Sequence, residues 1–282
     1  MPDRLPPLGE VIRRHGLTAK RALGQNFLLD LNLTRRIARA AGAGDGRHIL
    51  EIGAGPGGLT RALLAEGAAH VVAIERDRRC IAALEEVRAA HAGRLTIVEG
   101  DALAIGHSAL VAAPARIVAN LPYNIATPLV IGWLSAEPWP PWWERAVLMF
   151  QKEVADRIVA APGSGAYGRL SVIAQWRARA RALFTVNARA FTPPPRVTSA
   201  VVEIVAAPEP PQAPRLATLE KITGAAFGQR RKMLRSSLRA VSDDVAGLLG
   251  EAGIDPSLRA EQVSVAAFVE LARLLETRGG GV

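Results

Sequence analysis

The stretch "ILEIGAGPGGLT", from Ile49 to Thr60, decides the fold of this 282-residue chain. Its β-branched apolar run ends in glycines, and "LTRALLAEG" then begins a helical pattern. Gly53, Gly55 and Gly58 satisfy G-x-G-x-x-G in the strand–turn–helix context that this motif requires. Such glycines let the backbone approach a ligand, and the helix N-terminus offers it free N–H groups. The motif alone does not separate NAD from S-adenosylmethionine, or either from a tight turn without a ligand.

Strand-like and helical runs alternate on both sides of this stretch. The strand-like runs are "RHILEI", "HVVAIE", "RLTIVEG", "ARIVAN" and "RAVLMF". The helical segments between them include "LTRALLAEG", "RRCIAALEEVRAAH" and "PLVIGWLS". Strands separated by helices predict an α/β fold with a parallel sheet covered on both faces.

A Pro-rich stretch, "AAPEPPQAPR", interrupts this alternation and is expected to be a linker over 206–215. No convincing strand follows it, and four short helices are expected: "LATLEKITGAAFG", "RRKMLRSSLRAV", "DDVAGLLGEAG" and "VAAFVELARLLE". We therefore expect a Rossmann-like catalytic domain over 47–205. A basic arm and first helices over 1–46 belong to the same domain, and a smaller all-helical domain occupies 216–282.

Composition narrows the class of protein. The chain is 49% hydrophobic, has a formal net charge of +9 and contains one cysteine, Cys80. No apolar run approaches the roughly 18 residues that span a membrane, and the N-terminus lacks the apolar stretch of a secretory signal. A single cysteine excludes an intrachain disulfide framework and is expected to be buried packing, so we expect a cytoplasmic protein. The positive excess favours a polyanionic partner.

Two acidic residues follow predicted strands in register with the glycine loop. Glu75 ends "HVVAIE", 22 residues after Gly53, where a carboxylate can accept both hydroxyls of a ribose. Asp101 follows the next strand and can accept from an adenine amine, with the Ala102 N–H directed to the ring. Helix capping is the alternative role for both acids, and Asp77 can cap the next helix while Glu75 binds. Together they predict an adenosine pocket at the carboxyl edge of the sheet.

The segment "RIVANLPYNIATP" then brings Asn120, Leu121, Pro122 and Tyr123 to the end of the fourth strand. NAD chemistry has no use for Asn-x-Pro-Tyr, whereas methylation of an exocyclic amine does. The Asn120 oxygen and the Leu121 carbonyl can accept both N–H groups of the amine, which frees its lone pair for a methyl group. Pro122 directs the Leu121 carbonyl inward, and Tyr123 can stack on a flipped-out base. Tyr123→Phe, which keeps the ring, is expected to retain most activity.

With these motifs in place, the chain resembles the ribosomal small-subunit rRNA adenine dimethyltransferases, the KsgA family, from about Arg21 to about Glu276. The resemblance is carried by "ALGQNFL", "EIGAGPGGLT", "VVAIERD", "EGDAL", "NLPYNIATP", "QKEVADRIVA", "YGRLSV", "FTPPPRVTSAVV" and "FGQRRKMLRSSL". It implies a Rossmann-like class I fold and S-adenosyl-L-methionine as cofactor. The implied reaction is N6,N6-dimethylation of two adjacent adenosines in a hairpin loop near the 3′ end of 16S rRNA, within ribosome biogenesis.

The resemblance also implies site residues, which carry over by position. The cofactor contacts fall on Asn26, Leu28, Gly53, Gly55, Glu75, Asp101, Ala102 and Asn120. The base site falls on Asn120, Leu121, Pro122, Tyr123 and Phe191. Phe191 would be the second stacking face opposite Tyr123; a core aromatic is the alternative.

The basic residues of "FGQRRKMLRSSLRAV" are the candidate RNA contacts. If this stretch is one helix, Arg231, Arg235 and Arg239 recur on one face, away from the apolar side chains. The set expected to bind phosphates is Arg231, Lys232, Arg235 and Arg239. The basic arm can add Arg4, Arg13, Arg14, Lys20 and Arg21.

Three rival functions remain open. They are a 23S rRNA adenine methyltransferase of the erythromycin-resistance type, a DNA adenine methyltransferase, and a non-catalytic ribosome-assembly or transcription factor on the same fold. We expect a monomer. We also expect no metal, because the histidines lack ligand spacing and one cysteine cannot complete a typical zinc set. The tryptophans of "EPWPPWWERA" match no motif; they are Trp139, Trp142 and Trp143. They are expected to pack, with a hydrophobic lid or an RNA-stacking surface as the alternatives.

Overall fold

The computed structural model describes residues 5–19, 25–208 and 213–279. Three residues of the expected basic arm lie outside these ranges: Arg4, Lys20 and Arg21. No helix in the described part of the chain is both long and apolar enough to cross a membrane.

The chain folds into two compact units. The first unit comprises Met1–Gly132, Pro141–Ala155 and Arg181–Ala206; the second comprises Trp133–Pro140, Asp156–Ala180 and Ala207–Val282. The second unit thus takes in 133–140 and 156–180, two segments that a linear division of the sequence groups with the catalytic domain. This unit therefore contains α7 (Arg169–Trp176) in addition to the helices that follow the Pro-rich segment.

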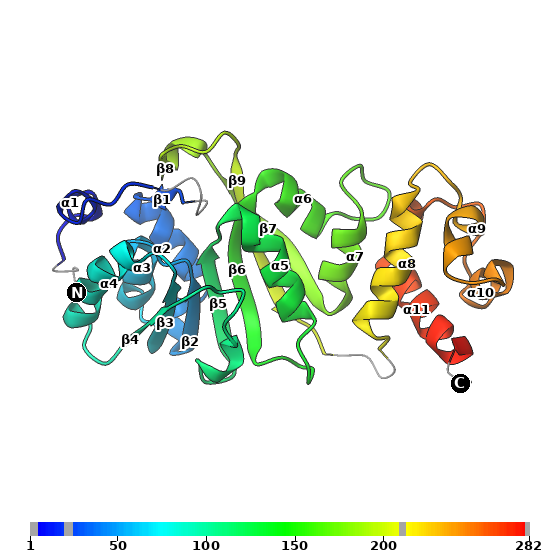
Figure 1. The fold of residues 1–282 in the computed structure, drawn as a ribbon, viewed down its shortest axis with the longest axis horizontal. Helices are drawn as coiled ribbons and strands as arrows, with labels where there is room; N and C mark the ends of the chain where they lie inside the picture. Colours follow the sequence, from blue (N-terminus) through cyan, green and yellow to red (C-terminus); the bar gives the residue numbers. More distant parts are fainter. Residues whose placement is uncertain (1–4, 20–24, 209–212, 280–282) are drawn as a thin grey trace. The chain divides into compact units, whose positions relative to one another are not determined.

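A seven-stranded sheet, counted over the described residues, runs in the order β4-β3-β2-β5-β6-β9-β7 (Figure 1). Its strands are β2 (His48–Ile52), β3 (His70–Glu75), β4 (Leu95–Glu99), β5 (Ala115–Asn120), β6 (Trp143–Gln151), β7 (Ala178–Val186) and β9 (Ser199–Ala206). The first five pair in parallel, which confirms the predicted α/β fold. The strand order reverses beside β2, and ligands bind at this kind of position in open α/β sheets.

Helices cover this sheet because their apolar positions recur at helical spacing. They include α2 (Leu31–Ala40), α3 (Gly58–Ala65), α4 (Arg78–Ala90) and α5 (Tyr123–Leu134). In α4, Cys80, Leu84 and Val87 form a buried stripe, and the Asp77 carboxylate caps the helix by accepting from the backbone N–H of Arg79. Cys80 is buried as expected, and burial raises the pKa of its thiol to about 12.

Strands β7 and β9 were not predicted from the sequence. β9 lies antiparallel to β6 with its first six residues buried, so it extends the sheet rather than forming a loop. In β7, "ARARALFTV" carries arginines that break up the apolar pattern of a strand. Glu203 of β9 forms ion pairs with two of the neighbouring guanidinium groups, those of Arg181 and Arg145.

A second, two-stranded sheet joins distant parts of the chain. Strand β1 (Phe27–Leu28) pairs antiparallel with β8 (Phe191–Thr192), which places Leu28 opposite Phe191. Both strands are too short for their pattern to identify them in the sequence. Their pairing brings the segment before α2 to the carboxyl edge of the large sheet.

The second unit contains the expected C-terminal helices α8 (Leu216–Gly228), α10 (Val245–Glu251) and α11 (Val265–Gly279), drawn yellow to red in Figure 1. Phe227, which is partly buried, packs between two buried aromatic rings of this unit, with its ring centroid 5.8 Å from that of Tyr167 and 5.5 Å from that of Phe268.

The expected helix over "RRKMLRSSLRAV" is wrong. α8 ends at Gly228, a turn follows, and only α9 (Leu234–Ser237) and a 3-10 turn over Leu238–Ala240 are helical. Met233 instead pairs with Arg259 in an isolated β-bridge, and the Leu234 N–H donates to the Leu258 carbonyl. A tertiary pairing therefore overrides the local helical preference.

The tryptophan stretch packs, as expected. In the second unit the Trp139 indole N–H donates to the Ala207 carbonyl at 2.7 Å, and the Arg177 guanidinium lies 5.0 Å from the ring centroid. In the first unit Trp143 is buried in β6, and Trp142 lies 6.4 Å from the His107 ring.

Candidate active site

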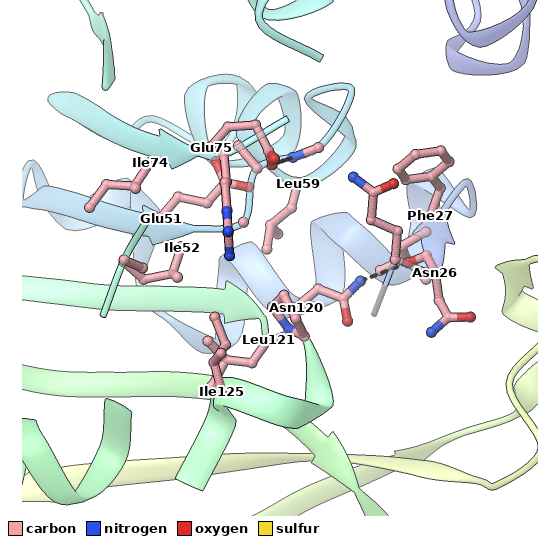
Figure 2. Close-up of a pocket in the computed structure, with 18 of the residues that line it drawn as sticks. Asn26, Phe27, Glu51, Ile52, Leu59, Ile74, Glu75, Asn120, Leu121 and Ile125 are labelled. Atoms are coloured by element: carbon pink, nitrogen blue, oxygen red, sulfur yellow. Dashed lines mark hydrogen bonds between the residues drawn. The ribbon is translucent and has the colours of Figure 1, made fainter. Parts of the chain in front are cut away.

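A pocket opens at the carboxyl edge of the large sheet, within the first unit (Figure 2). Predicted site residues from five separate segments line it: Asn26, Leu28, Gly53, Gly55, Glu75, Asp101, Ala102, Asn120, Leu121, Pro122 and Tyr123. Of the residues assigned to the cofactor and base sites, Phe191 alone does not line it. The structure thus brings together groups that lie about 100 residues apart in the chain.

The glycine loop joins β2 to α3 in a conformation that other residues rarely adopt. Gly53, Gly55 and Gly57 have φ values of 70°, 55° and 87°, in the left-handed region that favours glycine. Gly58 begins α3, and a Cβ on it would lie 2.9 Å from the Leu28 carbonyl oxygen. The loop therefore keeps its backbone close to the pocket, as the motif predicts, and also close to β1.

Glu75 ties this loop to the end of β3. One carboxylate oxygen accepts from the backbone N–H of Gly55 at 2.7 Å (Figure 2). The other accepts from the backbone N–H of Asp77 at 2.7 Å. Burial raises the pKa of Glu75, and these backbone hydrogen bonds oppose that rise. An ionised carboxylate has about four acceptor positions, so the two bonds leave capacity for ligand hydroxyls.

Glu51 is a second buried acid in the pocket, and it was missed in the sequence. Its side chain is 1% exposed and lines the pocket, and its Oε2 has no hydrogen-bond partner among the described residues. Burial raises the pKa of Glu51 to about 8, and the nearby negative charge of Glu75 adds to the rise. A signal was available, since an acid in the buried run "ILEI" breaks the apolar pattern of a central strand.

The acidic loop after β4 lines another wall of the pocket. The Asp101 carboxylate accepts from the Leu103 N–H at 3.0 Å and forms a 3.0 Å ion pair with Arg76, which also lines the pocket. The bond to Leu103 closes a local turn and caps no helix, because the described chain has only turns directly after Asp101, and Asp101 still lines the pocket. Ala102 is buried beside it.

The residues after β5 form the remaining wall. Asn120 ends the strand, and its side-chain nitrogen donates to the Asn26 carbonyl at 3.2 Å (Figure 2). This bond fixes the amide plane and leaves the side-chain oxygen as the acceptor. Pro122 packs against the glycine loop, because a Cβ on Gly53 would lie 3.4 Å from its Cδ. Tyr123 begins α5 half-buried, and burial raises the pKa of its phenol.

Phe191 is next to the pocket lining and does not itself line the pocket. It is 3% exposed, sits in β8 opposite Leu28 and belongs to the main hydrophobic core. This position matches the alternative of a core aromatic. A role as a second stacking face remains a prediction.

The candidate RNA contacts belong to the second unit. Arg231, Lys232, Arg235 and Arg239 are all exposed, although no single helical face carries them. Arg230, next to them, is held by the Tyr167 carbonyl at 2.9 Å. In the described residues no group of three or more His, Cys, Asp or Glu side chains is arranged to hold a metal ion.

The donor set of the pocket has a clear chemical preference. It combines a glycine loop, acids at the ends of adjacent strands and the orphaned buried carboxylate oxygen of Glu51. A buried carboxylate oxygen without a partner is costly, and a cationic ligand group relieves that cost. These residues fit a nucleoside carrying a positive charge.

Comparison with known proteins agrees with this geometry. The family model of the ribosomal RNA adenine dimethylases matches residues 16–277. A protein of Azorhizobium caulinodans named ribosomal RNA small subunit methyltransferase A is 59% identical over 281 residues, which are 99% of this chain and 96% of that protein. A protein of the same name from Rhodopseudomonas palustris is 61% identical over 274 residues, 97% of this chain and 95% of that one.

Two solved structures share the fold. A dimethyladenosine transferase from Plasmodium falciparum superposes with a TM-score of 0.72 at 24% identity, covering 90% of this chain and 98% of that one. The 23S rRNA methyltransferase ErmE superposes with a TM-score of 0.67 at 25% identity, covering 89% of this chain and 100% of that one.

Proposed function

Since the chain belongs to the ribosomal RNA adenine dimethylase family, we propose that it uses S-adenosyl-L-methionine to dimethylate N6 of two adjacent adenosines in a hairpin loop near the 3′ end of 16S rRNA. Its Rossmann-like sheet is that of class I methyltransferases. The substrate is the small ribosomal subunit or its precursor in the cytoplasm, and the reaction forms part of ribosome biogenesis.

The placement of Asn120 is the observation that supports this chemistry most directly. Its amide shares one pocket with the glycine loop and Glu75, and its nitrogen is already engaged by Asn26. The amide oxygen can accept one N–H of an adenine amine, while the Leu121 carbonyl accepts the other. Both bonds strengthen as the nitrogen becomes tetrahedral, so they stabilise the transition state more than the ground state.

The cofactor supplies an electrophilic methyl group on a positively charged sulfur. Glu75 would accept the ribose hydroxyls, and Asp101 with the Ala102 N–H would hold the adenine. Glu51, whose raised pKa of about 8 keeps its carboxyl mostly protonated at neutral pH in the free protein, would ionise beside the cationic end and so satisfy its orphaned oxygen. No strong general base is needed, because the attacking amine loses its proton after the methyl group is transferred.

Selection of the small subunit is supported by the names of the relatives and by the charge of the chain. Relatives about 60% identical over almost the full length are named small-subunit methyltransferases, whereas the 23S enzyme ErmE is 25% identical. The net charge of +9 favours a nucleic acid partner, and the exposed basic side chains of the second unit would contact its phosphates.

Methyl transfer to separated ribosomal subunits tests the proposal. The protein is incubated with labelled cofactor and either small- or large-subunit particles that lack the modification. We expect label on N6-dimethyladenosine of the small-subunit RNA alone. Label on the large subunit alone would instead support the erythromycin-resistance type, and no label on either RNA would contradict an enzymatic role.

A further inference from the structure

The phenol of Tyr123 is held by a residue that the sequence did not connect with the site. Its hydroxyl shares a 2.8 Å hydrogen bond with the Ser199 hydroxyl, 76 residues later in the chain. Tyr123 lines the pocket as the first residue of α5, whereas Ser199 is fully buried as the first residue of β9. The bond therefore links the pocket wall to the interior of the sheet.

Ser199 is a rigid anchor because the sheet fixes its backbone. It lies opposite Gln151 in the antiparallel pairing of β9 with β6. The adjacent backbone is also fixed, since the Lys152 N–H donates to the Thr198 carbonyl at 2.9 Å. Ala200 and Val201, which follow it, are buried. A hydroxyl on this strand can hold a partner in one orientation.

Tyr123 needs such an anchor more than a core aromatic does. Its ring is half-buried at the pocket, and it sits in the first turn of its helix directly after Pro122. One face of a stacking ring must stay open to the incoming base, so packing cannot restrain it from both sides. A hydrogen bond at the phenol end restrains rotation and tilt while leaving that face free.

We infer that Ser199 is a positioning residue that orients the Tyr123 ring to stack on the adenine being methylated. The inference rests on the proposed function, because that function supplies the adenine. It also changes the expectation for Tyr123→Phe. Keeping the ring is not sufficient, because the hydroxyl sets the orientation of the ring.

A purely structural role for the bond predicts different measurements. A buried serine hydroxyl needs a partner, and the phenol could serve only to satisfy it. In that case, breaking the bond lowers thermal stability and leaves the methyl-transfer rate unchanged. If the bond orients the ring, breaking it lowers the rate at saturating substrate without changing the affinity for the particle, since phosphate contacts supply most of that affinity.

The test is a double-mutant cycle on Ser199→Ala and Tyr123→Phe. Single-turnover methylation of small-subunit particles is measured at saturating cofactor, with particle and cofactor affinities and thermal unfolding measured in parallel. The control is Ser171→Ala, which removes a buried hydroxyl in the second unit that donates to the Arg157 carbonyl at 2.5 Å.

We expect each single variant to lower the saturated rate by about two- to tenfold, the range for one neutral hydrogen bond. The double variant should lose no more than either single one, because both break the same bond. Half-saturating particle concentration and cofactor affinity should stay unchanged, and Ser171→Ala should lose stability without losing rate.

Several outcomes would overturn the inference. A wild-type rate in either single variant, or losses that multiply in the double variant, means that the bond does not orient the ring. If Ser199→Ala unfolds, Tyr123→Phe still breaks the bond from the pocket side and decides the question. A wild-type protein that methylates no small-subunit adenine refutes the proposed function itself, a result distinct from an active enzyme insensitive to these changes.

Discussion

The side-chain nitrogen of Asn120 donates a 3.2 Å hydrogen bond to the backbone carbonyl of Asn26, 94 residues earlier in the chain. Asn26 directly precedes β1, which its pairing with β8 holds at the edge of the pocket. The backbone carbonyl of Asn26, in the segment before α2, therefore sets the plane of the Asn120 amide, which is proposed to orient the substrate amine. This preorganisation means that the amide does not have to rearrange as the reaction proceeds.

Replacing Asn120 by Ala should lower the single-turnover rate of methyl transfer by about 10²–10³, the range for removing one preorganised polar group. RNA affinity should barely change. Rates must be compared at saturating cofactor, because the amide also lines the cofactor pocket. Asn32→Ala, which removes an exposed amide on α2, is the control. A wild-type rate in Asn120→Ala would show that this amide does not act on the reacting amine.

Replacing Glu75 by Ala should weaken cofactor binding by about 10- to 100-fold, because a charged acceptor typically contributes about 1.5–3 kcal/mol. Calorimetry with S-adenosylmethionine and with NADH measures the loss and the selectivity. Glu99→Ala is the matched control, since Glu99 lies opposite Glu75 in the β3–β4 pairing but is exposed and paired with Arg78. Equal affinities of Glu75→Ala and wild type would place the ribose elsewhere.

Glu51 should make the folded protein less stable as pH rises. Its pKa is raised from 4.5 to about 8 in the folded state, so the folded chain binds an extra proton between these values. The free energy of unfolding should therefore fall from about pH 5 to pH 8, by up to about 1.4 kcal/mol per pH unit from this group. In urea unfolding across this range, Glu51→Gln should be less pH-dependent and should be the more stable protein at pH 8. Parallel pH profiles for the two proteins would contradict the raised pKa.

Replacing three exposed arginines, Arg231, Arg235 and Arg239, by Ala should weaken RNA binding and flatten its salt dependence. The log–log slope should fall by about one unit for each phosphate that the protein no longer neutralises, with cofactor affinity unchanged. The control changes the same number of charges at Arg39, Arg78 and Arg88, which pair with Glu66, Glu99 and Glu85. If both triple variants change the slope of the salt dependence equally, the change comes from the lower net charge and not from the loss of Arg231, Arg235 and Arg239.

Gly58→Ala should destabilise the first unit by about 1–3 kcal/mol, the usual cost of overpacking. The added methyl would lie 2.9 Å from the Leu28 carbonyl oxygen and 2.8 Å from the Leu8 side chain. Gly224→Ala is the opposite control, because within the described part of the chain nothing lies within 4 Å of the atom added to this helical glycine. It should gain up to about 1 kcal/mol in chemical unfolding. Similar changes in both variants would mean that the close approach at Gly58 is easily relieved.

The parallel strands and most of the pocket could be predicted from the sequence. Strands β2 to β6 are short, apolar and bounded by turn residues, so local pattern identifies them. The glycine loop, Glu75, Asp101 and Asn120 each follow such a strand, and carboxyl ends of parallel strands meet at one edge. Placing the strands therefore placed these side chains together.

The sequence did not predict strands β7 and β9 or the β1–β8 pair. These strands depend on pairing with distant parts of the chain, which local pattern does not show. A two-residue strand such as β1 has no period of its own and exists only through its pairing. The basic stretch failed for the opposite reason. Its helical pattern was real, but Met233 forms a bridge with Arg259, and only Leu234–Ser237 and the 3-10 turn over Leu238–Ala240 are helical. Local preference is worth only tenths of a kcal/mol per residue, so such pairings override it.

The sequence by itself determined the α/β fold, the glycine loop and the position of the "NLPY" segment at the end of a strand, because these depend on neighbouring residues and a simple period. Only the tertiary structure decided that Glu51 is a buried acid with an orphaned oxygen, that Asn26 orients Asn120, and that Ser199 holds Tyr123. Each of these depends on the distance between groups that the chain separates or on water being excluded. Burial and long-range hydrogen bonding arise only when the whole sheet has formed.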